Sequence, residues 1–229
     1  MLGLMEQNAV RPLHRILDGT LFDMDLRASS PRCRLTGRVG AVSGNGTWNG
    51  AGRTFDGAGD RVNIADEAAL RFGTGDFQIH IWCTHGTQVN DNGYFFTKGG
   101  TSDGAFVLRL DSSGTPGRIE VVGDGTTLSC NSSSDIYEND GIMHLFSLIR
   151  HGNEAKLYVD GVYSGIDSDV SGVDLDGAFD FAVGTITNYD ATYTWVGTVV
   201  RLVVANATKT FAQAEADMAA LFALGPYGN

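Results

Sequence analysis

Glycine separates short apolar runs along most of this chain, and this pattern limits the fold more than any other feature of the sequence. The 31 glycines among 229 residues are roughly twice the usual share. They follow no three-residue period, which excludes a collagen-like triple helix. They lie instead between apolar runs of strand length, as turn residues do in all-β proteins. The sequence therefore predicts an all-β fold.

The predicted strands follow Trp48. The run over residues 76–83 alternates in polarity and places four apolar side chains on one face: Phe77, Ile79, Ile81 and Cys83. Residues 142–150 and 154–160 flank His151-Gly152-Asn153, a sequence suited to a tight hairpin turn. Further strands are predicted over residues 93–98, 105–110, 118–122, 179–183 and 195–205.

One short helix is predicted near the C-terminus. Thr210 and Gln213 have the spacing of a capping box, and Gly225 followed by Pro226 is a stop signal. Apolar residues recur between them along one stripe: Phe211, Ala214, Met218, Leu221 and Phe222. We expect this helix to close one edge of the β structure.

The first 47 residues have a different character from the rest. Residues 1–53 carry a net charge of +3, against −14 for residues 54–229, and residues 1–40 show no sustained period. We predict an irregular N-terminal arm over residues 1–47 and one domain over residues 48–229. The arm would lie on its own acidic domain or on an acidic neighbour, and a solvated face without a partner is the alternative. The arginines expected to bind a partner are Arg11, Arg15, Arg27, Arg32 and Arg34.

Composition excludes several partners. A net charge of −11 and a pI of about 4.7 argue against nucleic-acid binding. No apolar run approaches the roughly 18 residues of a membrane span, and the first residues lack the pattern of a secretory signal. Three cysteines do not form a disulfide framework in a chain of this size. We expect synthesis in a reducing cytosol, without membrane insertion.

Several stretches of the chain carry a family resemblance. In order along the sequence they are Thr54-Phe55-Asp56-Gly57 with Asp60-Arg61-Val62-Asn63-Ile64, Phe72 to Trp82, Phe96-Thr97-Lys98-Gly99, Met143-His144-Leu145 to Tyr158-Val159-Asp160-Gly161, and Trp195 to Val204. Together they resemble the laminin-G/pentraxin type of the concanavalin A-like lectin/glucanase superfamily over residues 48–225. The resemblance implies a jelly-roll sandwich of two antiparallel sheets, one of them concave, with function in the loops at the rim. Fold alone does not give the function.

Catalytic signatures are weak. Glycosidases on this fold use paired carboxylates on one strand, which must flank the scissile bond at about 5–9.5 Å. The nearest candidates, Glu120 and Asp124, are separated by Gly123, which is expected to end the strand. The sequence contains no Walker, His-Glu-x-x-His or Cys-x-x-Cys motif. We therefore predict a protein that is not an enzyme, with a glycoside hydrolase as an alternative.

The acidic segment from Asp167 to Gly172 indicates a calcium site. Its Asp, Asp, Ser and Gly have the spacing that opens an EF-hand loop, although position twelve is Ala178 where a bidentate Glu is needed. The expected ligands are Asp167, Asp169, Ser171 and Asp174, and Asp176 and Asp180 could substitute. The alternative is a solvated loop in which Asp and Ser stabilise turns. Calcium is thus a candidate cofactor.

Two segments have the composition of a sugar-binding site, which needs aromatic faces together with amide or carboxylate groups. They are residues 188–195 and residues 90–94. The candidate carbohydrate-binding residues are Tyr94, Asn188, Tyr189, Asp190, Tyr193 and Trp195. Trp195 begins a predicted strand, so a core position is the alternative for this residue.

These observations favour a non-catalytic binding or structural protein. Single modules of this kind that lack a leader resemble bacteriophage virion components, either head decorations or parts of tail fibres. On that hypothesis the N-terminal arm attaches the protein to other virion proteins, the chain forms a homo-oligomer, and its rim loops face solvent or a host surface glycan. The alternative is a free lectin-like module, with or without a dependence on calcium.

Overall fold

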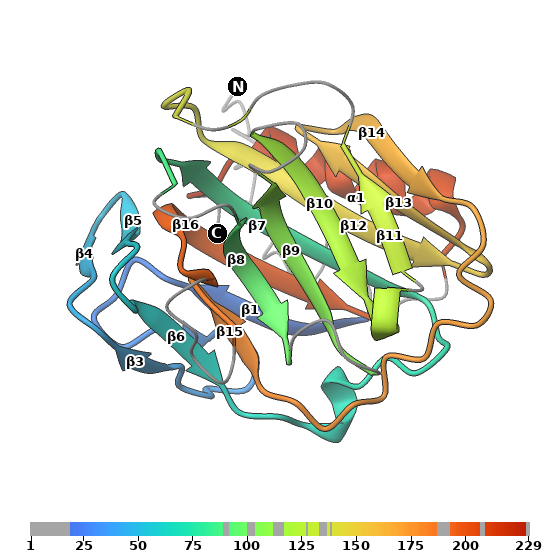
Figure 1. The fold of residues 1–229 in the computed structure, drawn as a ribbon, viewed down its shortest axis with the longest axis horizontal. Helices are drawn as coiled ribbons and strands as arrows, with labels where there is room; N and C mark the ends of the chain where they lie inside the picture. The colour runs from blue at the N-terminus through green and yellow to red at the C-terminus, as the bar shows by residue number, and fades with distance from the viewer. Residues whose placement is uncertain are drawn as a thin grey trace, which may run out of the picture.

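The alternation of apolar and polar residues produces two antiparallel β-sheets that stack face to face (Figure 1). The computed structural model describes residues 19–88, 92–99, 104–111, 117–126, 128–132, 137, 139–186, 193–206 and 209–227. The apolar faces of both sheets enclose one core, which includes Phe77, Ile79, Ile81 and Cys83 as predicted. The all-β, two-sheet prediction is therefore confirmed.

The first sheet contains nine of the described strands. Its main path is β14 (Val162–Asp167), β13 (Glu154–Val159), β12 (His144–His151), β7 (Phe77–His85), β16 (Val196–Ala205), β1 (Thr20–Asp25) and β2 (Arg32–Cys33). The strand β5 (Gly52–Asp56) also pairs with β16, and β4 (Thr47–Asn49) pairs with β5.

The second sheet contains seven of the described strands and positions the candidate site. Its order is β11 (Leu128–Asn131), β10 (Arg118–Gly123), β9 (Phe106–Asp111), β8 (Asn92–Lys98), β15 (Phe181–Val183), β6 (Arg61–Ile64) and β3 (Ala41–Ser43). Two 3₁₀ turns lie outside the sheets, η2 (Ala68–Leu70) and η3 (Asp124–Thr126).

The predicted helix forms as α1 (Phe211–Leu224). Thr210 and Gln213 make both hydrogen bonds of the capping box, and Gly225 follows with a φ of 70°. The expected position at an edge is wrong, because α1 lies on the outer face of the nine-stranded sheet, behind β12 and β13 in Figure 1. Its buried side chains Met218 and Leu221 belong to one apolar cluster with outward-facing residues of that sheet: Trp82, Leu145, Ile149, Tyr158, Val200 and Val203.

The structure corrects the extent of the irregular arm. Residues 20–43 were assigned to the arm, yet they contribute β1 and β2 to one sheet and β3 to the other. Strand β1 lies between β16 and β2, with Met24 and Leu26 fully buried. The period-2 pattern of Phe22, Met24 and Leu26 covers too few residues to stand out from the sequence around it. Residues 1–18 of the predicted arm lie outside the described residues.

The family's characteristic turn is set by backbone conformation. Asp160 and Gly161 join β13 to β14, and both have positive φ, at 52° and 82°. A two-residue hairpin with positive φ at both positions is type I′, which matches the twist of the strands it connects. The predicted turn at His151-Gly152-Asn153 is also a two-residue hairpin, because His151 pairs with Glu154, but only Gly152 has a positive φ, at 58°, so this turn is not type I′.

Candidate functional site

The candidate site is a row of polar side chains on the outer face of the seven-stranded sheet. Tyr94 on β8 pairs with Arg109 on β9, and Arg109 pairs with Glu120 on β10. The inward neighbours on β9 and β10, such as Leu108 and Ile119, lie in the core. Because side chains alternate between the two faces of a strand, Arg109 and Glu120 point outward.

The three side chains of this row form one connected network. The Arg109 Nε donates to Glu120 Oε2 at 2.7 Å, and Arg109 Nη1 donates to the Tyr94 hydroxyl at 3.3 Å. The Arg109 guanidinium also lies 5.8 Å from the centroid of the Tyr94 ring, within reach of a cation–π interaction. The side chains of Arg109 and Glu120 are 20% and 12% exposed, so water still reaches the pair.

An aromatic pair adjoins the row. The Tyr193 ring stacks on the Tyr94 ring with 4.6 Å between centroids and 23° between planes. Burial raises the pKa of Tyr94, although Arg109 opposes the shift, so its phenol is uncharged at neutral pH. Tyr94 is only 3% exposed, whereas Tyr193 is partly exposed and is the ring that can meet a ligand.

Two further rows flank the network along the strands. Val107 pairs with Val122 on one side, and both belong to an apolar cluster with Tyr94. Asp111 pairs with Arg118 on the other side, and the two side chains form an ion pair at 3.3 Å. The outer face therefore places aromatic, buried apolar and paired-charge side chains next to one another.

The segment that carries Tyr193 is anchored to the core. Trp195 is fully buried, and its Nε1 donates to His85 Nδ1 at 2.8 Å. Burial lowers the pKa of His85 to about 3, which keeps this imidazole uncharged and able to accept. Gln88 adds a hydrogen bond from the Val196 amide to its Oε1 at 3.0 Å. These contacts fix the chain on one side of Tyr193.

The six predicted carbohydrate-binding residues have different outcomes. Tyr94 and Tyr193 lie together in the site. Trp195 cannot present its ring to a ligand because it is a core residue, as the alternative interpretation held. Asn188, Tyr189 and Asp190 lie outside the described residues. Sequence reasoning missed Arg109 as a site residue, although the polarity alternation of residues 106–111 marks it as facing outward.

The residues predicted to bind calcium accept backbone hydrogen bonds instead of converging on one point. Asp167 accepts from the Ser129 amide at 2.8 Å, and Asp169 accepts from the Ser171 amide at 3.2 Å as well as from the Ser171 hydroxyl at 2.6 Å. Asp174 lies apart from them, in a pocket of about 290 Å³ that also has Gly104, Asp124, Asp176 and Gly177 in its lining. Within the described part of the chain, no three His, Cys, Asp or Glu residues are placed to hold a metal ion. The calcium site stays a prediction.

Glu120 and Asp124, the carboxylates considered as a catalytic pair, bind separate partners. Glu120 binds Arg109 on the sheet face. Asp124 accepts from the amides of Gly104 and Asp174, each at 3.0 Å, and so holds together the loops around the acidic pocket. The two carboxylates therefore have different structural roles.

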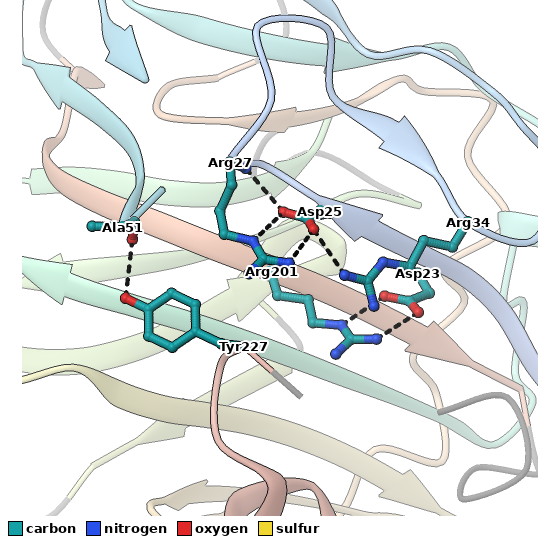
Figure 2. A network of polar contacts seen from close by, with 7 residues as sticks. All are labelled: Asp23, Asp25, Arg27, Arg34, Ala51, Arg201 and Tyr227. Atoms are coloured by element: carbon teal, nitrogen blue, oxygen red, sulfur yellow. Dashed lines mark hydrogen bonds and ion pairs between the residues drawn. The ribbon is translucent and has the colours of Figure 1, made fainter. Parts of the chain in front are cut away.

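Three of the arginines assigned to partner binding make contacts within their own chain. Arg27 and Arg34 both pair with Asp25 (Figure 2), and the Arg34 contact measures 2.8 Å. Arg32 donates to the Gly37 carbonyl. Burial raises the pKa of Asp25, but the hydrogen bonds and charges of Arg27 and Arg34 outweigh it and lower this pKa well below its usual value. Arg11 and Arg15 lie outside the described residues.

The family of the chain follows from its sequence as well as its fold. Residues 55–213 match the family described as the concanavalin A-like lectin/glucanases superfamily, laminin-G type 3. The chain belongs to this family, whose description covers both lectins and glucanases. No curated protein matches the chain. No helix among the described residues is long and apolar enough to cross a membrane.

Solved structures with the same fold are parts of longer proteins. A sialidase of Trypanosoma rangeli matches with a TM-score of 0.69 and 17% identity over 91% of this chain and 33% of that one. The binding domain of Paraclostridial Mosquitocidal Protein 1 matches with a TM-score of 0.70 and 10% identity over 90% of this chain and 52% of that one. The receptor-binding domain of botulinum neurotoxin D matches with a TM-score of 0.68 and 10% identity over 91% of this chain and 53% of that one. The chain thus spans about a third to a half of these neighbours, and identities this low show the fold alone.

Proposed function

We propose that the protein is a non-catalytic glycan-binding module whose ligand lies on the outer face of the seven-stranded sheet. The observation that carries this proposal is the stacked Tyr94–Tyr193 pair beside the Arg109–Glu120 ion pair. Aromatic faces pack against the apolar face of a sugar ring, and a charged pair offers donors and acceptors to its hydroxyls. The lectin-like family supports the same reading.

The neighbouring structures add support at the level of architecture. Two of them are a binding domain and a receptor-binding domain of toxins. Binding is a property of those toxins, and it indicates that this fold can serve binding within longer chains. A binding module of the same architecture is what we propose here.

Binding is tested with the full chain on a glycan array, followed by calorimetry, in calcium and again in chelator. We expect saturable binding that Tyr193→Ala weakens by about tenfold or more, equivalent to about 1.4 kcal/mol, because the exposed ring is lost. Tyr193→Phe is the matched control and should bind nearly as the unmodified chain does. Loss of binding in chelator would support the predicted calcium site. Unchanged binding by Tyr193→Ala would place the ligand elsewhere.

A glycoside hydrolase is the alternative, because the family also contains glucanases. The separate partners of Glu120 and Asp124 support a non-catalytic role. Prolonged incubation with each bound glycan, followed by product analysis, distinguishes the two functions. Any turnover that Glu120→Gln abolishes would overturn the non-catalytic proposal.

We also propose that the domain is carried on a bacteriophage virion, as a head decoration or tail-fibre part attached through its N-terminal residues, and that it forms a homo-oligomer. Residues 1–18 include Arg11 and Arg15, two of the arginines predicted to bind a partner, and such cations support attachment to an acidic neighbour. Deletion of residues 1–18 keeps every described strand, so it tests attachment without removing part of a sheet. Normal incorporation of this variant into virions would contradict the anchoring role.

A further inference from the structure

On strands β8 to β11 of the candidate glycan face, the cations that reach solvent are each matched by a carboxylate. On the described parts of β8 to β11 the basic residues are Lys98, Arg109 and Arg118. Arg109 pairs with Glu120, and Arg118 pairs with Asp111. The Lys98 side chain is fully buried and donates to the Gly177 carbonyl, away from solvent. The described part of β8 to β11 therefore presents ion pairs instead of single positive charges.

The sequence on either side of these strands adds no positive charge. Residues 89–91, 112–116 and 187–192 contain no Lys, Arg or His, and they include Asp91 and Asp190. The whole chain carries a net charge of −11. An anionic ligand would therefore approach a field of its own sign, with no unmatched cation in the described site to offset the repulsion.

The paired arrangement suits hydroxyl groups. A guanidinium has five N–H donors, and the contacts of Arg109 with Glu120 and Tyr94 use three of them. Each carboxylate oxygen of Glu120 can accept more than one hydrogen bond. A sugar hydroxyl donates and accepts at once, so it can bridge the two side chains without breaking their ion pair. A ligand carboxylate can only accept, and it would have to compete with Glu120 for Arg109.

We infer that the ligand of this face is a neutral glycan, not a sialylated or uronic-acid-containing one. The inference rests on the proposed function and narrows its ligand class. Charge neutrality of the site predicts an affinity that changes little with salt.

The test compares matched glycans, each neutral oligosaccharide with its sialylated form, by calorimetry on the full chain. We expect the unmodified protein to bind the neutral form at least about tenfold more tightly, with little change between low and high sodium chloride. Glu120→Gln removes the carboxylate and leaves Arg109 without its counterion. We therefore expect the affinity for the sialylated form to rise and the preference for the neutral form to fall by about tenfold. Asp111→Asn should act in the same direction through Arg118.

The outcomes distinguish the neutral-ligand inference from the proposed glycan binding. Tighter binding of the sialylated form by the unmodified protein would overturn the neutral-ligand inference and leave glycan binding standing. An absence of binding to every glycan would overturn the proposed function and the inference together. If Glu120→Gln unfolds, as thermal melting would show, Asp111→Asn decides the outcome, and an unchanged preference in a folded variant contradicts the charge argument.

Discussion

Arg201 and Asp23 form an ion pair that lies almost wholly out of solvent, with side chains 2% and 5% exposed. Two hydrogen bonds join them, from Arg201 Nε and Nη2 to the two carboxylate oxygens, at 2.8 and 2.7 Å (Figure 2). Replacing both partners by apolar residues of similar size is often neutral, whereas removing one leaves a buried charge without its counterion. The pair ties β1 to β16, so its loss acts on the junction of these two neighbouring strands of the nine-stranded sheet.

Asp23→Ala is therefore expected to lower the free energy of unfolding by about 3–5 kcal/mol. Urea unfolding followed by circular dichroism measures the change. Asp25→Ala is the matched control two residues away, and its partly exposed partners should limit the loss to about 1 kcal/mol. Equal effects of the two substitutions would show that burial does not decide the strength of the Asp23–Arg201 pair.

At the scale of elements, sequence periodicity predicted the sheets, whereas composition predicted only Tyr94 and Tyr193 of the site. Alternation in β7 and the capping box of α1 are local patterns, so each could be identified from a few residues. The site depends on register, because Tyr94, Arg109 and Glu120 meet only when three strands align. Their spacing in sequence gives no sign of that alignment. Trp195 is the opposite case. The aromatic composition of residues 188–195 predicted it as a binding residue, yet it lies in the core.

Strand β1 is the element on which sequence and structure differ most, and it can be tested by deletion. Removing residues 1–26 takes away β1, and with it the buried Phe22, Met24 and Leu26. We expect this variant to fail to fold, because three large core side chains and one full strand pairing are lost. Circular dichroism and solubility measure the result. Deletion of residues 1–18, which leaves β1 in place, is the control. If the 1–26 deletion still folds, β1 is not needed by the domain, and the predicted arm over residues 1–47 would stand.

At the scale of the whole molecule, buried imidazoles make stability depend on pH. His80 is 1% exposed and bonds with Ser147 Oγ at 2.9 Å and Gln78 Oε1 at 3.2 Å. Burial lowers the pKa of His80 to about 3, whereas in the unfolded chain an imidazole titrates near about 6.5. Between these two values the unfolded chain binds a proton that the folded chain does not. The stability that His80 contributes is present above pH 6.5 or so and is lost as pH falls.

The expected loss is about 2–3 kcal/mol between pH 6.5 and 4.5, taken as roughly 1.4 kcal/mol for each pH unit. Urea unfolding at a series of pH values measures it, and His80→Gln should flatten the slope by about one proton. Ser147→Ala is the matched control, since it removes the partner hydroxyl but keeps the imidazole buried, and so should lower stability at every pH without changing the slope. His85, whose pKa burial also lowers to about 3, adds a second proton to the same range. A His80→Gln variant that retains the full acid sensitivity would show that His80 does not contribute to it, and would leave His85 and the carboxylates as its source.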